Sequence, residues 1–150
     1  MVNKKFKDFE TLLREINWNV TLKGRETLKK FNSSNTQLLC MSTLFFAKQE
    51  EPNREFTMGE LAKNIDMSFS ATTNLVDRLV ANNLIERKRS AKDRRKVIIN
   101  LSENGEILIK QVILLRQEYL QKICRNISST EIDSLIQILT KLSDLMKKGK

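Results

Sequence analysis

The sequence predicts a mainly α-helical fold of the α+β class, with six helices and one short β-hairpin. Apolar residues recur at helical spacing through most of the 150 residues, Ser or Thr stands in a capping position before five helical segments, and one β-branched run follows a basic cluster. The length suits one domain. With 40% apolar residues and a single proline, disorder over the whole chain is excluded.

Two helices are expected before the centre of the chain. The first covers the first twenty-odd residues, where five apolar side chains share one helical face: Phe6, Phe9, Leu13, Ile16 and Val20. Gly24 weakens this helix, and the polar stretch after Phe31 interrupts it. Ser34 and Gln37 form a capping box, so a second helix is predicted over residues 35–50.

Two shorter helices follow, joined by a tight turn. Thr57 and Glu60 form another capping box before the first of them. Ser68 is placed to cap the second, which runs from Phe69 to about Asn82 and combines an apolar side with a polar N-terminal end. Two such helices are typical of a helix-turn-helix.

A β-hairpin comes next and carries most of the net charge. The β-branched run at residues 97–101 predicts a strand that pairs with residues 84–89. The ten residues from Arg87 to Lys96 hold seven basic side chains and one acid, so they contribute +6 of the formal charge of +9. A basic hairpin tip behind a helix-turn-helix predicts a wing that binds a polyanion, although a basic run alone equally fits a solvated charged loop.

The last third of the chain is predicted to be helical again. Ser102 is placed to cap a long helix, and Ser128 with Glu131 opens a final one. Together with the N-terminal helix, these helices carry more apolar surface than one chain needs, which predicts packing against a second copy. We therefore expect a helical dimerisation region at 1–34 and 102–150 around a winged helix-turn-helix at 35–101, with the helix at 35–50 bridging the two.

Composition excludes several classes of protein. The chain has no histidine, no glycine-rich phosphate-binding loop, and only two cysteines, Cys40 and Cys124, which are far apart. We therefore expect no enzyme, no metal site and no cofactor. No apolar run approaches the roughly 18 residues of a membrane span, and no signal-peptide pattern follows Met1, so a soluble, cytoplasmic protein is expected.

The segment from Phe56 to Gly105 resembles the MarR family of bacterial winged-helix transcriptional regulators. The matching pieces are Glu60-Leu-Ala62, Leu75-Val-Asp-Arg-Leu79, Asp93-Arg-Arg95 and Leu101-Ser-Glu-Asn-Gly105. The resemblance implies a homodimer that binds pseudo-palindromic double-stranded DNA. It also implies a repressor, commonly one released by a small-molecule effector or by oxidation.

The resemblance further implies which side chains contact DNA. In the second short helix and the wing they are Ser68, Ser70, Thr72, Thr73, Asn74, Arg78, Arg87, Arg89, Asp93, Arg94, Arg95 and Lys96. Arg95 would enter the minor groove, braced by an ion pair with Asp93, because a narrow minor groove attracts arginine. Arg94 and Lys96 would meet the phosphate backbone.

Two positions depart from the family pattern. Asn74 stands where many relatives have arginine, and since asparagine pairs bidentately with adenine, the preferred operator sequence stays open. Asn83 replaces the usual glycine before the hairpin. Asparagine tolerates left-handed backbone geometry, so the turn is expected to persist.

Alternatives stay open for several of these features. The polar start of the second short helix also fits a solvent-facing turn, and Asp93 also fits a turn residue. Both cysteines fit small buried hydrophobes better than redox sensors. Trp18, Phe45, Phe46 and Met58 fit either an effector cavity or, more simply, core packing. The predicted winged helix-turn-helix as a whole also fits an interaction module that binds protein or RNA without operator specificity.

Overall fold

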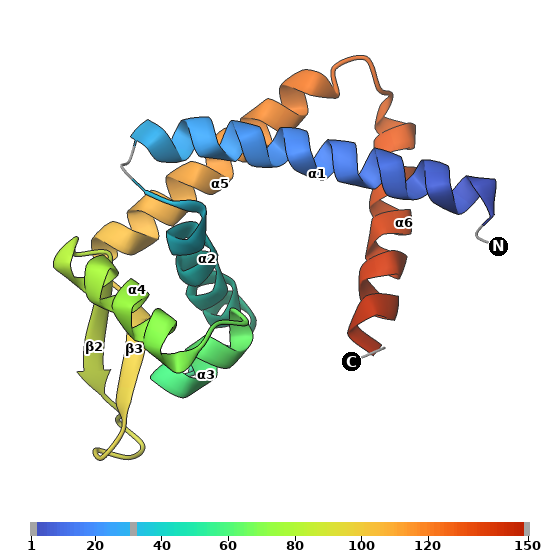
Figure 1. Cartoon of the computed structure of the whole chain (residues 1–150). Helices are drawn as coiled ribbons and strands as arrows, with labels where there is room; N and C mark the ends of the chain where they lie inside the picture. Colours follow the sequence, from blue (N-terminus) through green and yellow to red (C-terminus); the bar gives the residue numbers. More distant parts are fainter. Residues whose placement is uncertain (1–2, 31–32, 149–150) are drawn as a thin grey trace. The chain divides into compact units, whose positions relative to one another are not determined.

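The computed structural model describes residues 3–30 and 33–148, which form a mainly helical chain with one small sheet (Figure 1). The chain divides into two compact units, one ending at Arg116 and the other beginning at Gln117. The elements are α1 (Lys4–Lys30), α2 (Asn35–Glu50), β1 (Phe56–Thr57), α3 (Met58–Asn64), α4 (Phe69–Ala81), β2 (Ile85–Arg89), β3 (Val97–Leu101), α5 (Glu103–Ile123) and α6 (Ser129–Lys148). The predicted winged helix-turn-helix is confirmed, and α5 crosses the division.

The capping residues begin the helices of the first unit as predicted. Before α2, the backbone N–H of Gln37 donates to Ser34 Oγ at 3.2 Å, and the Gln37 side chain accepts from the Ser34 N–H at 2.7 Å. Thr57 and Glu60 make the same reciprocal pair before α3, and the hydrogen bonds from Thr57 lower the pKa of the Glu60 carboxyl. Ser68 caps α4 at 3.2 Å.

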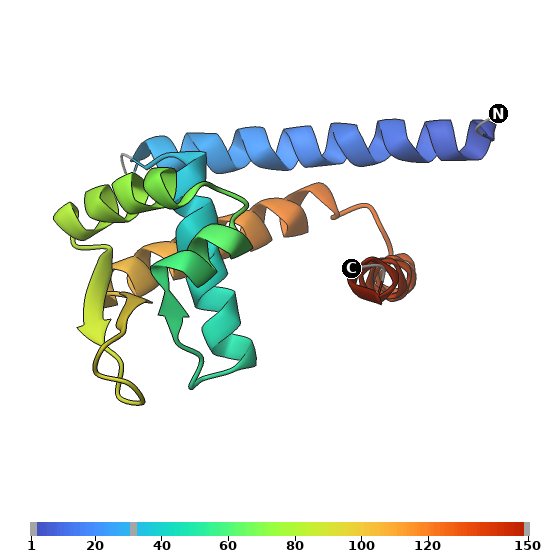
Figure 2. The same cartoon turned by 60° about the horizontal axis from the view of Figure 1, so that its bottom comes forward.

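Three antiparallel strands form the sheet, in the order β1-β3-β2. The predicted hairpin pairs Ile85 with Leu101 at its base and Arg89 with Val97 at its tip. The loop between these strands projects from the helices α2, α3 and α4 in both views (Figure 2). Strand β1 was not predicted. It has only two residues, and its pairing of Phe56 with Ile99 joins segments far apart in the sequence.

A single hydrophobic core holds the helix-turn-helix, the sheet and the first turns of α5 together. From α4 it takes Leu75, Val76 and Leu79. From α5 it takes Leu108, Ile109 and Val112. The start of α5, which was expected with the dimerisation region, is therefore packed into the core of the winged helix. Dimerisation through 1–34 and 102–150 stays a prediction.

The turn after α4 is bonded directly to the start of α5. Asn83 has a φ of 55°, the left-handed conformation that was expected of it. Ser102 donates from Oγ to Asn83 O at 2.6 Å and from its backbone N–H to Leu84 O at 3.1 Å. The same hydroxyl accepts from the N–H of Gly105 at 3.0 Å. The base of the hairpin and the first turn of α5 thus meet backbone to backbone.

The helix of the second unit, α6, has no buried side chain. Ser128 and Glu131 open it with the predicted capping box. Its exposed apolar residues are Leu135, Ile136, Ile138, Leu139, Leu145 and Met146. Within the described ranges, no helix is long and apolar enough to cross a membrane.

Replacing Gly105 by alanine is expected to destabilise the fold. A Cβ at this position would lie 2.0 Å from the backbone oxygen of Leu84 and 3.2 Å from Leu101 Cδ2, so the junction must shift. The expected loss is about 1–3 kcal/mol in the free energy of unfolding, despite the higher helix propensity of alanine. Urea denaturation measures it. Gly59→Ala is the matched control, because nothing lies within 4 Å of a Cβ there. Equal effects of the two substitutions would contradict the close approach.

The thiol of Cys40 is expected to resist alkylation. Cys40 is fully buried, and burial raises its pKa to about 12. At pH 8 only about one thiol in ten thousand is then a thiolate, the form that reacts. Iodoacetamide treatment followed by peptide mass spectrometry should label the partly exposed Cys124 well before Cys40. Similar labelling rates for the two cysteines would show that Cys40 is accessible.

Candidate nucleic-acid interface

The exposed side of α4, together with its N-cap residue, presents five of the twelve side chains predicted to contact DNA. Ser68, Ser70, Asn74 and Arg78 are exposed. Thr73 is partly buried and its hydroxyl donates to the backbone oxygen of Phe69 at 2.9 Å, which still leaves its oxygen able to accept. These positions form the outer side of the helix because the opposite side is packed into the core.

Thr72 does not lie on this surface, so its predicted contact with DNA is corrected. Its side chain is fully buried, and its hydroxyl donates to Ser68 O at 2.9 Å within the helix. The hydroxyl is satisfied locally, which allows a threonine to occupy a core position. The polar character of Thr72 suggested that its side chain points outward, but Thr72 lies on the same side of α4 as the buried Val76.

Phe69 is an exposed residue of this surface that was not singled out from the sequence. It is the first residue of α4, and its side chain is 62% exposed. A phenylalanine at the exposed N-terminal end of such a helix can contact the methyl group of thymine in a major groove. The signal in the sequence was an aromatic residue between two serines, in a turn otherwise made of small and polar residues.

Arg87 is held by the protein itself. Its guanidinium donates to Asp77 Oδ1 at 2.5 Å, which joins β2 to α4. Both side chains are partly exposed, so the pair is open to solvent and its energetic contribution is small. The pair connects the helix with the strand behind it, and the DNA contact that the resemblance implies for Arg87 stays a prediction.

In the wing loop, Asp93 acts as a turn residue. Its carboxylate accepts from the backbone N–H of Arg95 at 3.1 Å, and its backbone oxygen accepts from the N–H of Lys96 at 2.9 Å. Among the ion pairs of the described residues, none joins Asp93 to Arg95, so the expected brace is corrected. Asp93 orients the backbone of Arg95 and leaves its guanidinium available.

The exposed basic side chains of the hairpin include four that were predicted to contact DNA: Arg89, Arg94, Arg95 and Lys96. Arg89 donates to the backbone oxygen of Arg94 at 3.3 Å, across the loop. Lys96 also lies near Glu60 and contributes to the lowered pKa of that carboxyl. Arg94 and Arg95 stand at the loop itself, where an approaching phosphate backbone would meet them first.

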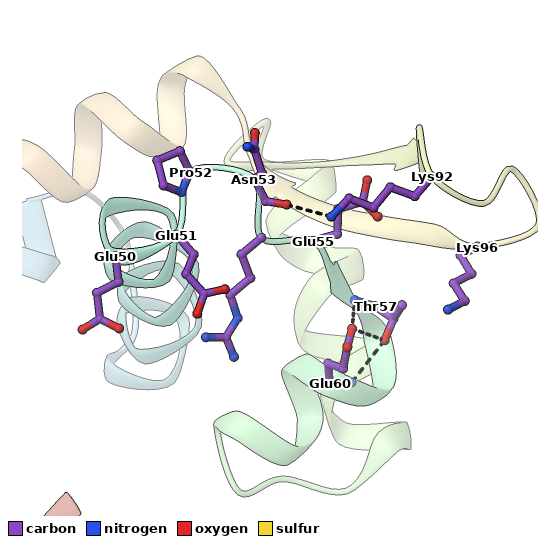
Figure 3. Close-up of a pocket in the computed structure, with 10 residues that line it drawn as sticks. Glu50, Glu51, Pro52, Asn53, Glu55, Thr57, Glu60, Lys92 and Lys96 are labelled. Atoms are coloured by element: carbon purple, nitrogen blue, oxygen red, sulfur yellow. Dashed lines mark hydrogen bonds between the residues drawn. The ribbon is translucent and has the colours of Figure 1, made fainter.

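Beneath the loop lies a pocket of about 770 Å³ between the wing and the turn after α2 (Figure 3). Lys92 reaches across it and donates to Asn53 O at 3.4 Å. Ser90, which is 2% exposed, donates to Glu55 Oε2 at 2.7 Å. Neither Ser90 nor Glu55 was singled out from the sequence, because a serine and a glutamate 35 residues apart carry no local pattern.

The four residues proposed for an effector cavity are not gathered into one. Phe45 and Met58 pack against the hydrophobic core. Phe46 is 52% exposed and meets Phe45 edge to face, with ring centroids 5.5 Å apart. Trp18 is 56% exposed on α1, and the hollow beside it is lined by residues of α1 alone. The core interpretation therefore holds for Phe45 and Met58.

In the described ranges, no group of three or more His, Cys, Asp or Glu side chains is placed to hold a metal ion. The chemistry available at this surface is that of hydroxyl, amide and guanidinium groups on an exposed helix and an adjacent basic loop. Such groups donate to phosphates and to base edges.

Comparison with known proteins agrees with this geometry. Residues 34–97 match the sequence profile of the MarR family. The uncharacterised HTH-type transcriptional regulator YsmB of Bacillus subtilis is 35% identical over 94% of this chain and 92% of its own. The transcriptional repressor MprA of Escherichia coli is 30% identical over 81% of this chain and 67% of its own.

Solved structures give the same result. A MarR family protein from Bacillus stearothermophilus superposes with a TM-score of 0.85 at 33% identity, covering 98% of this chain and 99% of the other. The family and these relatives are transcription regulators, not enzymes. With its exposed α4, its basic wing and these relatives, the chain belongs to the MarR family of DNA-binding transcriptional regulators.

Proposed function

We propose that the protein is a homodimeric repressor that binds a pseudo-palindromic operator in double-stranded DNA, in the cytoplasm, and is released by a small-molecule effector. The observation that carries the DNA-binding part is the pairing of an exposed α4 N-terminus with a basic wing in one compact unit. In this arrangement α4 enters the major groove, and the wing loop lies over the phosphate backbone and the adjacent minor groove.

The proposed contacts differ in the part of the DNA that they bind. Phe69, Ser70 and Asn74 lie on the exposed side of α4 and are assigned to base edges. Ser68, Thr73 and Arg78 are assigned to phosphates at the mouth of the groove. In the wing, Arg95 is assigned to the minor groove, and Arg89, Arg94 and Lys96 to the backbone.

Exposed apolar side chains support the homodimer. On α1, Phe6, Ile16 and Trp18 are each more than half exposed, and on α6 the same is true of Ile138 and Met146. A single soluble chain rarely leaves so many large apolar residues on two helices in contact with water. A second copy covers them with an interface that is the same on both chains.

Repression rests on a relative, and effector release rests on the resemblance to the MarR family. The name of MprA describes a transcriptional repressor, and that role is transferred here as part of the proposal. Since Phe45 and Met58 belong to the core, the effector cavity is not assigned to them. Oxidation of Cys40 is a poor alternative signal, because burial raises the pKa of its thiol far above neutral.

Selection of genomic fragments by the purified protein tests the proposal directly. At near-physiological salt, sequencing of the retained duplexes should recover an inverted repeat with half-sites about 10 base pairs apart, centre to centre, because each subunit places one α4 in the major groove. Retention without a shared motif, weakening steeply with salt, would instead favour an interaction module that binds protein or RNA. Folded RNA as competitor separates those two outcomes.

Arg95→Ala is expected to weaken operator binding by roughly 1–3 kcal/mol per site, because the wing loses its one groove contact on each subunit. Fluorescence anisotropy at several salt concentrations measures both the affinity and its salt dependence. Arg116→Ala is the matched control, since it removes an exposed arginine from α5 outside the wing. Unchanged affinity and salt slope for Arg95→Ala would show that the wing does not contact DNA.

A further inference from the structure

The wing loop is organised around one buried hydroxyl. Ser90 Oγ accepts from the backbone N–H groups of Lys92 at 3.1 Å and Asp93 at 3.0 Å, and donates to Glu55 Oε2 at 2.7 Å. A serine hydroxyl has one donor and two acceptor positions, so all three are in use. At 2% exposure the group is closed to water, and these three partners fix its orientation.

The contact with Glu55 ties the loop to a different part of the chain. Glu55 lies in the segment between α2 and β1, which the core holds through the adjacent Phe56. A second contact, from Lys92 Nζ to Asn53 O at 3.4 Å, joins the same two segments. The loop is therefore attached to the body of the module as well as to its own two strands.

From this arrangement we infer that the hydrogen bond between Ser90 and Glu55 is a latch that holds the wing loop in the orientation used to contact DNA. Ser90 and Glu55 are positioning residues, acting through Arg94 and Arg95. A free loop with several like charges would lose conformational freedom when it is ordered on DNA, whereas a latched loop is ordered beforehand. This inference rests on the proposed function, since it assumes that the wing contacts DNA.

The sign of the effect of Glu55 separates the latch from simple electrostatics. A carboxylate beside the basic loop repels phosphates, so its removal would by charge alone strengthen binding to DNA. The latch predicts the reverse. Glu55→Ala should weaken operator binding roughly three- to tenfold, the equivalent of one net hydrogen bond. Ser90→Ala should weaken it at least as much, because it also removes the two bonds from the backbone N–H groups of Lys92 and Asp93.

Two further variants complete the design. Glu55→Gln keeps an oxygen that accepts from Ser90 while it removes the charge, so it should bind at least as tightly as the unmodified protein. Glu51→Ala is the matched control. Glu51 lines the same pocket but makes no side-chain hydrogen bond to the loop among the described contacts, so its removal should leave binding equal or slightly stronger.

Amide hydrogen exchange in the free protein tests the latch without DNA. The backbone amides of Lys92 and Asp93 should exchange several-fold faster in Ser90→Ala and Glu55→Ala, and at the original rate in Glu55→Gln and Glu51→Ala. Melting temperatures establish that each variant is folded. Unchanged exchange in Glu55→Ala, or unchanged or tighter DNA binding by it, would overturn the inference. If the unmodified protein selects no operator, the proposed function fails, while the exchange rates still decide whether the latch exists.

Discussion

Burial of one side of α4 is the constraint on which the rest of the module depends. Leu75, Val76 and Leu79 enter the core, and each fully buried aliphatic side chain contributes on the order of 1.5–3 kcal/mol. Because the buried side of α4 is fixed in the core, the exposed side faces solvent in one orientation only. Thr72 can join the buried side since its hydroxyl is satisfied by Ser68 within the helix. The polar exposed surface and the apolar buried one are thus two results of the same packing.

Local signals allowed most of the helices and the hairpin to be predicted. A capping box needs only residues three apart, and it was correct before α2, α3 and α6. Features that depend on distant partners were not visible. Strand β1 exists because Phe56 meets Ile99, and nothing in a two-residue segment indicates such pairing. In the candidate site, residue type predicted the exposed arginines but misjudged Thr72, because periodicity and polarity pointed in opposite directions there.

Concentrating like charges in a short loop has a physical cost that the structure offsets locally. Seven basic side chains between Arg87 and Lys96 repel one another, and repulsion favours an extended, mobile loop. The backbone is held instead by hydrogen bonds to two small side chains, Ser90 and Asp93. Both side chains accept from backbone N–H groups, so these bonds use none of the guanidinium groups of the loop. The order of the loop and its charge are therefore supplied by different residues.

The hairpin is closed at its base by the bonds of Ser102 to Asn83 and Leu84, and at its tip by the bond from the Ser90 backbone N–H to Lys96 O. Five paired residues per strand separate these two closures, which corresponds to about 17 Å. The distance between the two ends of the wing is therefore fixed. One added residue at the start of β3 would turn the core residues Ile99 and Leu101 to the opposite face of the sheet, so the length of the strand cannot change in single steps. The number of paired residues in β2 and β3 consequently sets how far along a DNA duplex the loop can reach from α4.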